Sequence, residues 1–277
     1  MNHEAGCRRQ ALPAPTRSVA VRRHVIAAVA VWVVLTAIGE TLALADLYPT
    51  VGSSEAEDFD RIFRILIVMG MPVFTFVIAV LFYCVIRFGS FGKPSEDGPA
   101  YRGAGLGPRV WLAVTGSLAL TVMIFPGLTG LAELQPDKSG YGWGESNAEL
   151  VVRVVGFRWS WTMEYADAGV TVSTAQGKEL VLPVDTHVKF EIESTDVIHS
   201  FWIPAFRMKI DALPGRTTHM TVKTTALGRF EDDDAYRVQC AELCGLDHST
   251  MTFPVRVVPR AEFEQWLQSQ KPAATAQ

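Results

Sequence analysis

Apolar residues are concentrated in three long stretches in the first half of the chain, at residues 25–45, 65–86 and 110–132. About 20 consecutive apolar residues are needed for a helix to cross the hydrocarbon core of a bilayer. The second and third stretches meet this length, and Pro72 and Pro126 inside them are tolerated in membrane helices. They predict a transmembrane helical hairpin within residues 46–133.

The first stretch permits two interpretations. It follows an arginine-rich tail and precedes the small-residue sequence Ala43-Leu44-Ala45, and Glu40 interrupts it. A basic region, a short apolar core and an A-x-A pattern are typical of a secretory signal. Residues 25–45 are also just long enough for an uncleaved helix. The sequence favours a signal peptide over residues 1–45, and an extra N-terminal transmembrane segment is the alternative.

Charged residues around the spans predict the topology. Residues 1–23 carry five arginines and residues 87–109 carry four basic residues, whereas residues 46–60 contain acidic residues and no base. The positive-inside rule places the two basic regions in the cytoplasm. We therefore expect residues 46–60, and everything after residue 134, to lie outside.

A linker rich in Gly, Ser and Asp, residues 134–147, separates the spans from a region where the hydrophobic period is two. Alternation between turn signals predicts strands at residues 150–155, 179–182, 187–192, 220–222 and 255–258. Many short strands favour a β-sandwich or barrel over residues 148–260. Residues 261–277 are expected to form a C-terminal helix and tail, because Phe263, Trp266 and Leu267 have helical spacing.

Composition narrows the function further. The 277 residues carry a net charge of −4, and from residue 135 onward 14 basic residues stand against 19 acidic ones. This balance argues against nucleic acid as a partner. Cys7 lies in the N-terminal tail and Cys84 inside an apolar span, so the four cysteines do not form a disulfide framework. Cys240 and Cys244 are left as a pair.

That pair belongs to a short stretch, residues 240–251, which also contains His248 and Met251. Soft thiolates and a thioether, together with imidazole, select copper over hard cations. Two thiolates four residues apart can bridge a pair of copper ions, and His199 is the candidate for a second imidazole. A disulfide or a structural zinc site are the alternatives, but neither accounts for Met251.

The pattern Cys-x-Glu-x-Cys-Gly-x-x-His-x-x-Met at residues 240–251 resembles cytochrome c oxidase subunit II. Val-Ile-His-Ser-Phe-Trp at residues 197–202 and Asp-Ala-Leu-Pro-Gly-Arg at residues 211–216 extend the resemblance. It is specific over residues 150–260 and looser over the two apolar spans before them. It implies a cupredoxin-type Greek-key β-barrel that follows a transmembrane hairpin.

The resemblance also implies a dinuclear copper centre. Its metal-binding residues would be His199, Cys240, Glu242, Cys244, His248 and Met251. The two cysteines would bridge both ions, His199 and Met251 would complete one ion, and His248 and the Glu242 carbonyl would complete the other. The free side chain of Glu242 would bind magnesium or manganese at the contact with the catalytic subunit.

Two segments depart from the family pattern. Trp159, the expected point of electron input, lies in Phe-Arg-Trp-Ser-Trp, where the family more often has His-Gln and Tyr around the tryptophans. We expect the second tryptophan, Trp161, to pack in the core. Near the last span, the family often has a glutamate three residues before a tryptophan, at a proton-uptake mouth. Pro108 occupies that position before Trp111 and cannot accept a proton.

These features predict one subunit of a haem-copper terminal oxidase in the plasma membrane of a prokaryote. It would accept electrons from cytochrome c and pass them to haem in subunit I, where oxygen is reduced to water; other oxidase subunits would be its partners. The alternative is a membrane-anchored copper-binding or copper-delivery protein. Cytochromes c commonly present a basic face, so acidic residues near the ligands are candidates for donor docking: Asp196, Asp211, Asp247 and the run at residues 231–234.

Overall fold

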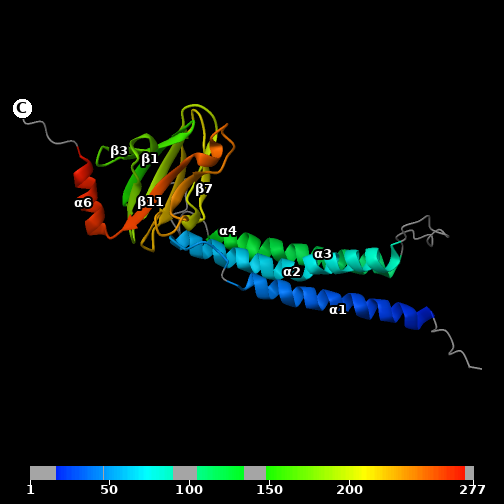
Figure 1. Ribbon diagram of the computed structural model, residues 1–277. Helices are drawn as coiled ribbons and strands as arrows, with labels where there is room; N and C mark the ends of the chain where they lie inside the picture. The colour runs from blue at the N-terminus through cyan, green and yellow to red at the C-terminus, as the bar shows by residue number, and fades with distance from the viewer. Residues whose placement is uncertain (1–16, 46, 90–104, 134–147, 272–277) are drawn as a thin grey trace, which may run out of the picture. The chain divides into compact units, whose positions relative to one another are not determined.

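A computed structural model of the protein describes residues 17–45, 47–89, 105–133 and 148–271 (Figure 1). The chain forms two compact units, which are described separately. One unit comprises residues 1–45 and 67–108, and the other comprises residues 46–66 and 109–277. The predicted linker, residues 134–147, lies outside the described residues.

Three helices among the described residues are long and apolar enough to cross a membrane, namely Arg22–Ala43, Ser54–Arg87 and Leu106–Leu131. The first is part of α1 (Arg17–Ala43), and the second is nearly all of α2 (Ser54–Phe88). The third comprises α3 (Leu106–Val122), a kinked segment η1 (Met123–Leu128) in which Phe125 has an extended backbone, and α4 (Thr129–Glu133). The predicted span 65–86 therefore lies within one longer helix, whereas the span 110–132 runs through α3 and α4 with a kink at Phe125. The first apolar stretch is also helical.

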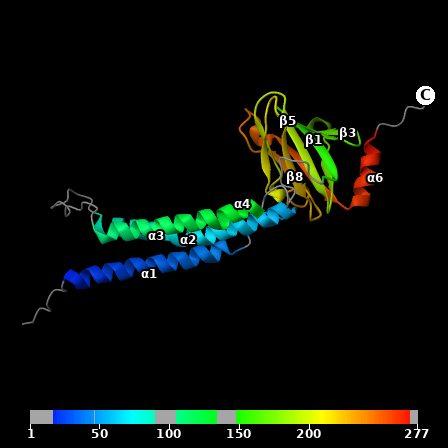
Figure 2. The ribbon, with the colours of Figure 1, turned by 180° about the vertical axis from the view of Figure 1, so that it is seen from behind.

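The β-structure consists of two sheets (Figures 1 and 2). The first sheet has the order β3 (Val170–Ser173), β2 (Ser160–Tyr165), β1 (Leu150–Phe157), β5 (His187–Ser194) and β8 (Thr218–Lys223). The second has the order β4 (Leu180–Pro183), β11 (Thr252–Val258), β10 (Arg237–Cys240), β6 (His199–Trp202) and β7 (Lys209–Ala212), and β9 (Gly228–Arg229) pairs with β11. The β1–β5 and β11–β4 pairs are parallel, and the others are antiparallel.

Alternating side chains of the two sheets meet in one core. Trp161 of the first sheet lies 5.7 Å from Phe201 of the second, measured between ring centroids, and Phe190 lies 5.1 Å from the same ring. All three side chains are fully buried. Aromatic side chains remove large apolar areas from water, so these contacts hold the two sheets face to face.

The helix α6 (Arg260–Gln270) closes one end of this core. Phe263 is buried, and Phe263 and Trp266 both pack against the ring of Tyr165. The hydroxyl of Tyr165 in turn donates a hydrogen bond to the carbonyl of Val181 and accepts one from the amide of Val181. The helix α6 coincides with the helical part of the predicted C-terminal region. Four of the five predicted strands lie within observed strands, and the fifth, residues 179–182, overlaps β4 except at Glu179.

The segment before α2 and the first turns of α2 pack against the sandwich. Ser53 forms a bridge with Thr224, and a side-chain oxygen of Glu55 accepts the amide hydrogen of Lys223 at 3.0 Å. Further along the helix, Asp60 accepts two hydrogen bonds from Arg207, each 2.8 Å long. These contacts explain why α2 extends beyond its apolar part, since its polar start belongs to the same compact unit as the sandwich.

Candidate metal centre

The candidate site lies where β6 begins and β10 ends. Cys240 pairs with Phe201, and the amide of Ala241 donates to the carbonyl of Ser200 at 2.9 Å. This register places His199, the first residue of β6, beside the loop that leaves Cys240. The loop then turns through η4 (His248–Thr250) and rejoins the sheet at β11. His199 is thereby brought next to Cys240, which lies 41 positions later in the sequence.

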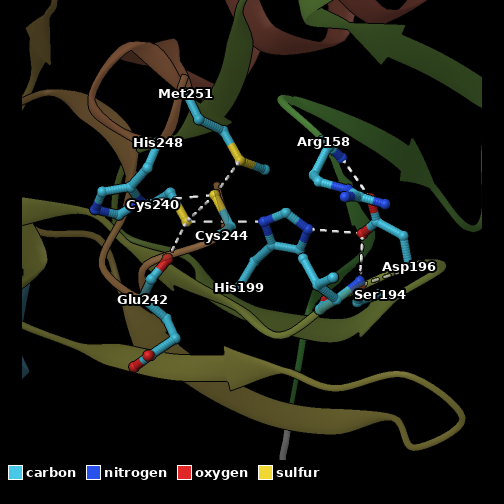
Figure 3. A network of polar contacts seen from close by, with 10 residues as sticks. Arg158, Ser194, Asp196, His199, Cys240, Glu242, Cys244, His248 and Met251 are labelled. Carbon is cyan, nitrogen blue, oxygen red and sulfur yellow. Dashed lines mark hydrogen bonds and ion pairs between the residues drawn. The ribbon is translucent and has the colours of Figure 1, made fainter. Parts of the chain in front are cut away.

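Four ligand candidates surround the two cysteine sulfurs (Figure 3). Cys240 Sγ and Cys244 Sγ are 3.7 Å apart. Nδ1 of His199 and the carbonyl oxygen of Glu242 lie 3.8 and 3.3 Å from Cys240 Sγ. Nδ1 of His248 and Sδ of Met251 lie 3.6 and 3.8 Å from Cys244 Sγ. The structure therefore brings all six sequence-predicted metal-binding residues together.

A carboxylate orients the buried imidazole of His199. Nε2 of His199 lies 2.8 Å from an oxygen of Asp196, while Nδ1 faces the sulfurs (Figure 3). When Nε2 carries the proton and donates it to Asp196, Nδ1 keeps a free lone pair. A carboxylate behind a histidine commonly fixes the tautomer in this way at metal sites.

Asp196 is itself held by several donors. It accepts hydrogen bonds from the amides of Val197 and Arg158, at 2.7 and 2.9 Å, and from the Arg158 guanidinium at 3.0 Å. Desolvation is the largest single influence on its pKa and raises it. The hydrogen bonds from His199 and from these donors together outweigh desolvation, so the pKa of Asp196 lies below its ordinary value. The residue is therefore an anion at neutral pH.

The Cys244 thiol holds its proton tightly in the absence of a cation. Burial, followed by the contact with the Cys240 sulfur, raises the pKa of Cys244 to about 12. Two buried thiolates 3.7 Å apart repel each other, which disfavours a doubly ionised pair. A bound cation would remove this penalty, because a metal replaces the thiol protons.

Two glycines are needed at the site because larger residues would not fit. Gly245 has φ +127°, and a Cβ there would lie 3.2 Å from the indole of Trp159. Gly156 is equally confined, since a Cβ would lie 2.9 Å from the ring of Trp161 and 3.4 Å from that of His199. Trp159 thus packs directly against the ligand loop, whereas Trp161 lies fully buried behind His199, as expected for a core residue.

The donor set fits copper better than the two alternatives. Both cysteines are free, with their sulfurs in contact and not bonded. The ligand atoms of His199, Cys240 and Cys244 lie within 4.8 Å of one another and could hold a metal ion. A zinc site of two cysteines and two histidines would be complete without a fifth donor. The fully buried Met251, aimed at Cys244, supplies the soft donor that copper prefers.

Comparisons with known proteins give the family. Residues 173–258 match the family model described as the periplasmic domain of cytochrome c oxidase subunit II. The solved periplasmic domain of subunit II from Bradyrhizobium japonicum is 34% identical, with 94% of that domain and 45% of this chain covered and a TM-score of 0.40. The chain belongs to the cytochrome c oxidase subunit II family.

Two curated relatives agree with this assignment. Cytochrome c oxidase subunit 2 of Synechocystis is 28% identical over 267 residues, which cover 83% of this chain and 77% of the relative. Haem-copper oxidase subunit 2 of Aeropyrum pernix is 45% identical over 114 residues, which cover 41% of this chain and 46% of the relative. Membership makes the protein one subunit of an oxidoreductase complex, with apolar helices and a cupredoxin-like extracytoplasmic domain, in a family that normally binds copper.

The sequence did not reveal the residues that orient the site. Asp196 was a candidate for donor docking, but the structure commits it to His199 and Arg158. Its position three residues before His199 was the available signal, because a carboxylate there can reach the histidine ring. Gly156 gave no signal of its own, since its role depends on the rings of Trp161 and His199, which meet it only in the folded protein.

Proposed function

We propose that the protein is the electron-accepting subunit of a haem-copper terminal oxidase. Cys240, Cys244, His199, Met251, His248 and the carbonyl of Glu242 would hold two copper ions. When bound, the copper pair would supply a one-electron site that accepts electrons from cytochrome c and delivers them to haem in subunit I, where oxygen is reduced to water. The convergence of four donors around the two cysteine sulfurs carries this proposal.

The distribution of the terminal donors supports two ions in place of one. His199 and the Glu242 carbonyl lie beside the Cys240 sulfur, and His248 and Met251 lie beside the Cys244 sulfur. If both sulfurs bind both ions, each ion needs two further donors to become four-coordinate, and four terminal donors are present. His199 with Met251, and His248 with the Glu242 carbonyl, each meet this requirement.

A separate site for magnesium or manganese is proposed at the carboxylate of Glu242. Figure 3 shows its carbonyl directed at the sulfurs and its carboxylate pointing away from them. The side chain is exposed and has no hydrogen bond or ion pair among the described residues. A hard carboxylate oxygen suits magnesium or manganese, which subunit I would help to bind at the contact between the subunits.

Electron input is proposed at Trp159. Its indole packs against Gly245 within the ligand loop, and the side chain is only partly buried. Leu243 and Leu246 of the same loop are 77% and 88% exposed, which is unusual for leucine and typical of an interaction surface. The exposed Asp247 lies next to Leu246 and forms no ion pair among the described residues. Asp211 and Asp247 therefore replace the paired Asp196 as the better candidates for steering a basic donor.

The acidic run at residues 231–234 is less suited to docking. Asp232 pairs with Arg229 at 2.6 Å, and Asp234 pairs with Arg237 at 3.3 Å. Local cations thus offset part of its negative charge. The run is a partly neutralised loop, so we expect its removal to change donor steering less than removal of Asp247.

We further propose that α1 is retained as a third transmembrane helix. Nε1 of Trp32 donates to the carbonyl of Pro72 at 2.8 Å, and the hydroxyls of Thr36 and Thr75 lie 2.7 Å apart. Polar contacts of this kind stabilise helix pairs in a membrane, where water offers no competing partner. Three passes place the basic residues 1–23 inside and the sandwich outside, in agreement with the positive-inside rule. A cleaved signal peptide would not need such contacts.

Purification from native membranes tests the proposal. The full-length chain should co-purify with a multispan haem-containing subunit, and the complex should oxidise reduced cytochrome c. Mass spectrometry of the purified chain should recover peptides from residues 24–45. Isolation of the chain with copper but without a haem subunit would instead support the copper-delivery alternative, and a mature N-terminus after Ala45 would refute the third span.

A further inference from the structure

A cavity outside the copper site lies against the first turns of α2. Its volume is about 660 Å³, and it is lined by Tyr48, Pro49, Thr50, Val51, Glu57, Asp60, Arg61, Arg64 and Ile65. All of these residues belong to one compact unit. The cavity is therefore formed by the segment that enters α2 and by the helix itself.

The cavity lies at the level expected for lipid headgroups. Below it, residues 65–86 are apolar, and 22 residues of helix extend about 33 Å, which matches a hydrocarbon core of about 30 Å. Arg64 immediately precedes this apolar part. The placement rests on the proposed topology, in which the start of α2 is extracytoplasmic. Tyr48, on the cavity wall, is of the type that anchors proteins at membrane interfaces.

Most charges around the cavity are already paired. Asp60 forms a buried ion pair with Arg207 at 2.8 Å, and Arg61 pairs with Asp58 at 2.9 Å. Arg64 is different, because it has no ion-pair partner among the described residues. Its guanidinium carbon lies 5.4 Å from the centroid of the Tyr48 ring, and its Nε is buried without a hydrogen-bond partner.

Glu57 is the other unpaired charge of the cavity. It is exposed and forms no ion pair among the described residues. Seven positions separate it from Arg64, or about two helical turns, so both side chains point to the same side of α2. Because Glu57 is closer to the start of α2, its carboxylate lies farther from the hydrocarbon core than the Arg64 guanidinium. The cavity therefore offers a cation near the membrane and an anion farther out.

We propose that this cavity binds the headgroup of a zwitterionic phospholipid with a primary ammonium group, such as phosphatidylethanolamine. The phosphate would accept hydrogen bonds from Arg64, whose planar guanidinium suits a phosphate. The ammonium, which extends outward from the phosphate, would donate to Glu57. Arg207 also donates to the carbonyls of Pro49 and Thr50, which line the cavity, so a bound lipid would brace the contact between α2 and the sandwich.

Native mass spectrometry of the delipidated full-length chain in detergent tests this assignment. Phosphatidylethanolamine, phosphatidylcholine, phosphatidylglycerol and inorganic phosphate are added separately. We expect one phosphatidylethanolamine to be retained at least about tenfold more strongly than the other lipids. Arg64→Gln should abolish this preference, and Glu57→Gln should remove the advantage over phosphatidylglycerol while leaving phosphate-dependent binding. Arg229→Gln, at an exposed site in the sandwich, is the matched control and should behave as the wild type.

Each contrary outcome overturns the proposal. Equal retention of phosphatidylethanolamine and phosphatidylglycerol, with no effect of Glu57→Gln, would show a general anion site. Binding of inorganic phosphate alone would exclude a lipid. Unchanged retention by Arg64→Gln would place the lipid elsewhere; Arg64→Lys, with an unfolding midpoint equal to that of the wild type, controls for misfolding. A cavity filled by a partner subunit in the intact oxidase would also refute it. These measurements do not depend on copper or on membrane sidedness, so failure here leaves the proposed function and topology untouched.

Discussion

Replacing Asp196 by asparagine should weaken copper binding, because Asp196 orients the proposed ligand His199 without being a ligand itself. Its carboxylate lies 2.8 Å from Nε2 of His199 and also accepts from the Arg158 guanidinium at 3.0 Å. Asparagine has a similar shape but carries no charge. Its amide can also turn its NH₂ group toward His199, which would favour the wrong tautomer of the ring.

The size of the effect can be worked from these contacts. Hydrogen bonds to charged groups contribute about 1.5–3 kcal/mol, and loss of a carboxylate behind a metal-bound histidine typically lowers affinity about 10–100-fold. That range corresponds to about 1.4–2.8 kcal/mol, so the two estimates agree. We therefore expect Asp196→Asn to bind copper about 10–100-fold more weakly than the wild type.

A competition titration of the full-length protein against a copper chelator measures this difference. Asp211→Asn is the matched control, because Asp211 is exposed and its side chain forms no contact with a ligand. Arg158→Gln should have a smaller effect than Asp196→Asn, since the contact between Asp196 and His199 is kept. Equal affinities for Asp196→Asn and the wild type would refute the orienting role, and an equal loss in Asp211→Asn would show a general effect of charge.

Three other perturbations test different parts of the structure. Trp159→Phe should slow oxidation of cytochrome c far more than it weakens donor binding, as stopped-flow kinetics would show; a wild-type rate under conditions limited by electron input would place that input elsewhere. Arg207→Met should lower the free energy of unfolding by about 3–5 kcal/mol, because it leaves Asp60 buried without its partner; chemical denaturation of the full-length chain measures this, and a loss below about 1 kcal/mol would contradict it. The hydrogen bond from Lys189 lowers the pKa of Glu191, so the pair stabilises the fold above the unfolded-state pKa and this contribution is lost as pH falls through the folded-state pKa. Glu191→Gln should therefore flatten the decline of the unfolding temperature between about pH 5 and pH 3, and an unchanged slope would contradict the assignment.

The sequence predicted those elements whose pattern is local. Residues 187–192 and 255–258 alternate clearly, and both lie within observed strands, β5 and β11. The strands β6 and β10 were not predicted, because each is defined by its partners and not by a local pattern. Their pairing at Cys240 and Phe201 is a long-range contact, which hydrophobic periodicity does not encode.

At the candidate site too, local features were predicted from the sequence and long-range contacts were not. Chemistry and spacing selected the soft donors of one short loop, Cys240, Cys244, His248 and Met251, and offered His199 as a second imidazole. Glu242 was added only by the resemblance to the family. The surrounding network was not predictable, because Arg158 and Asp196 come from different loops and meet only in the folded protein. The start of α2 was also missed, because polar residues 54–64 do not resemble a membrane span and form a helix that packs against the sandwich.

An electron paramagnetic resonance spectrum of the copper-loaded, full-length protein tests the central claim most directly. Two equivalent copper nuclei that share one unpaired electron should give more hyperfine lines than a single nucleus gives, with two copper ions bound per chain. The same spectrum should change in Met251→Leu, because one proposed ion loses a terminal donor while the sulfur pair is kept. A mononuclear spectrum with one copper per chain, or a preparation that retains zinc and resists copper, would contradict the proposed centre.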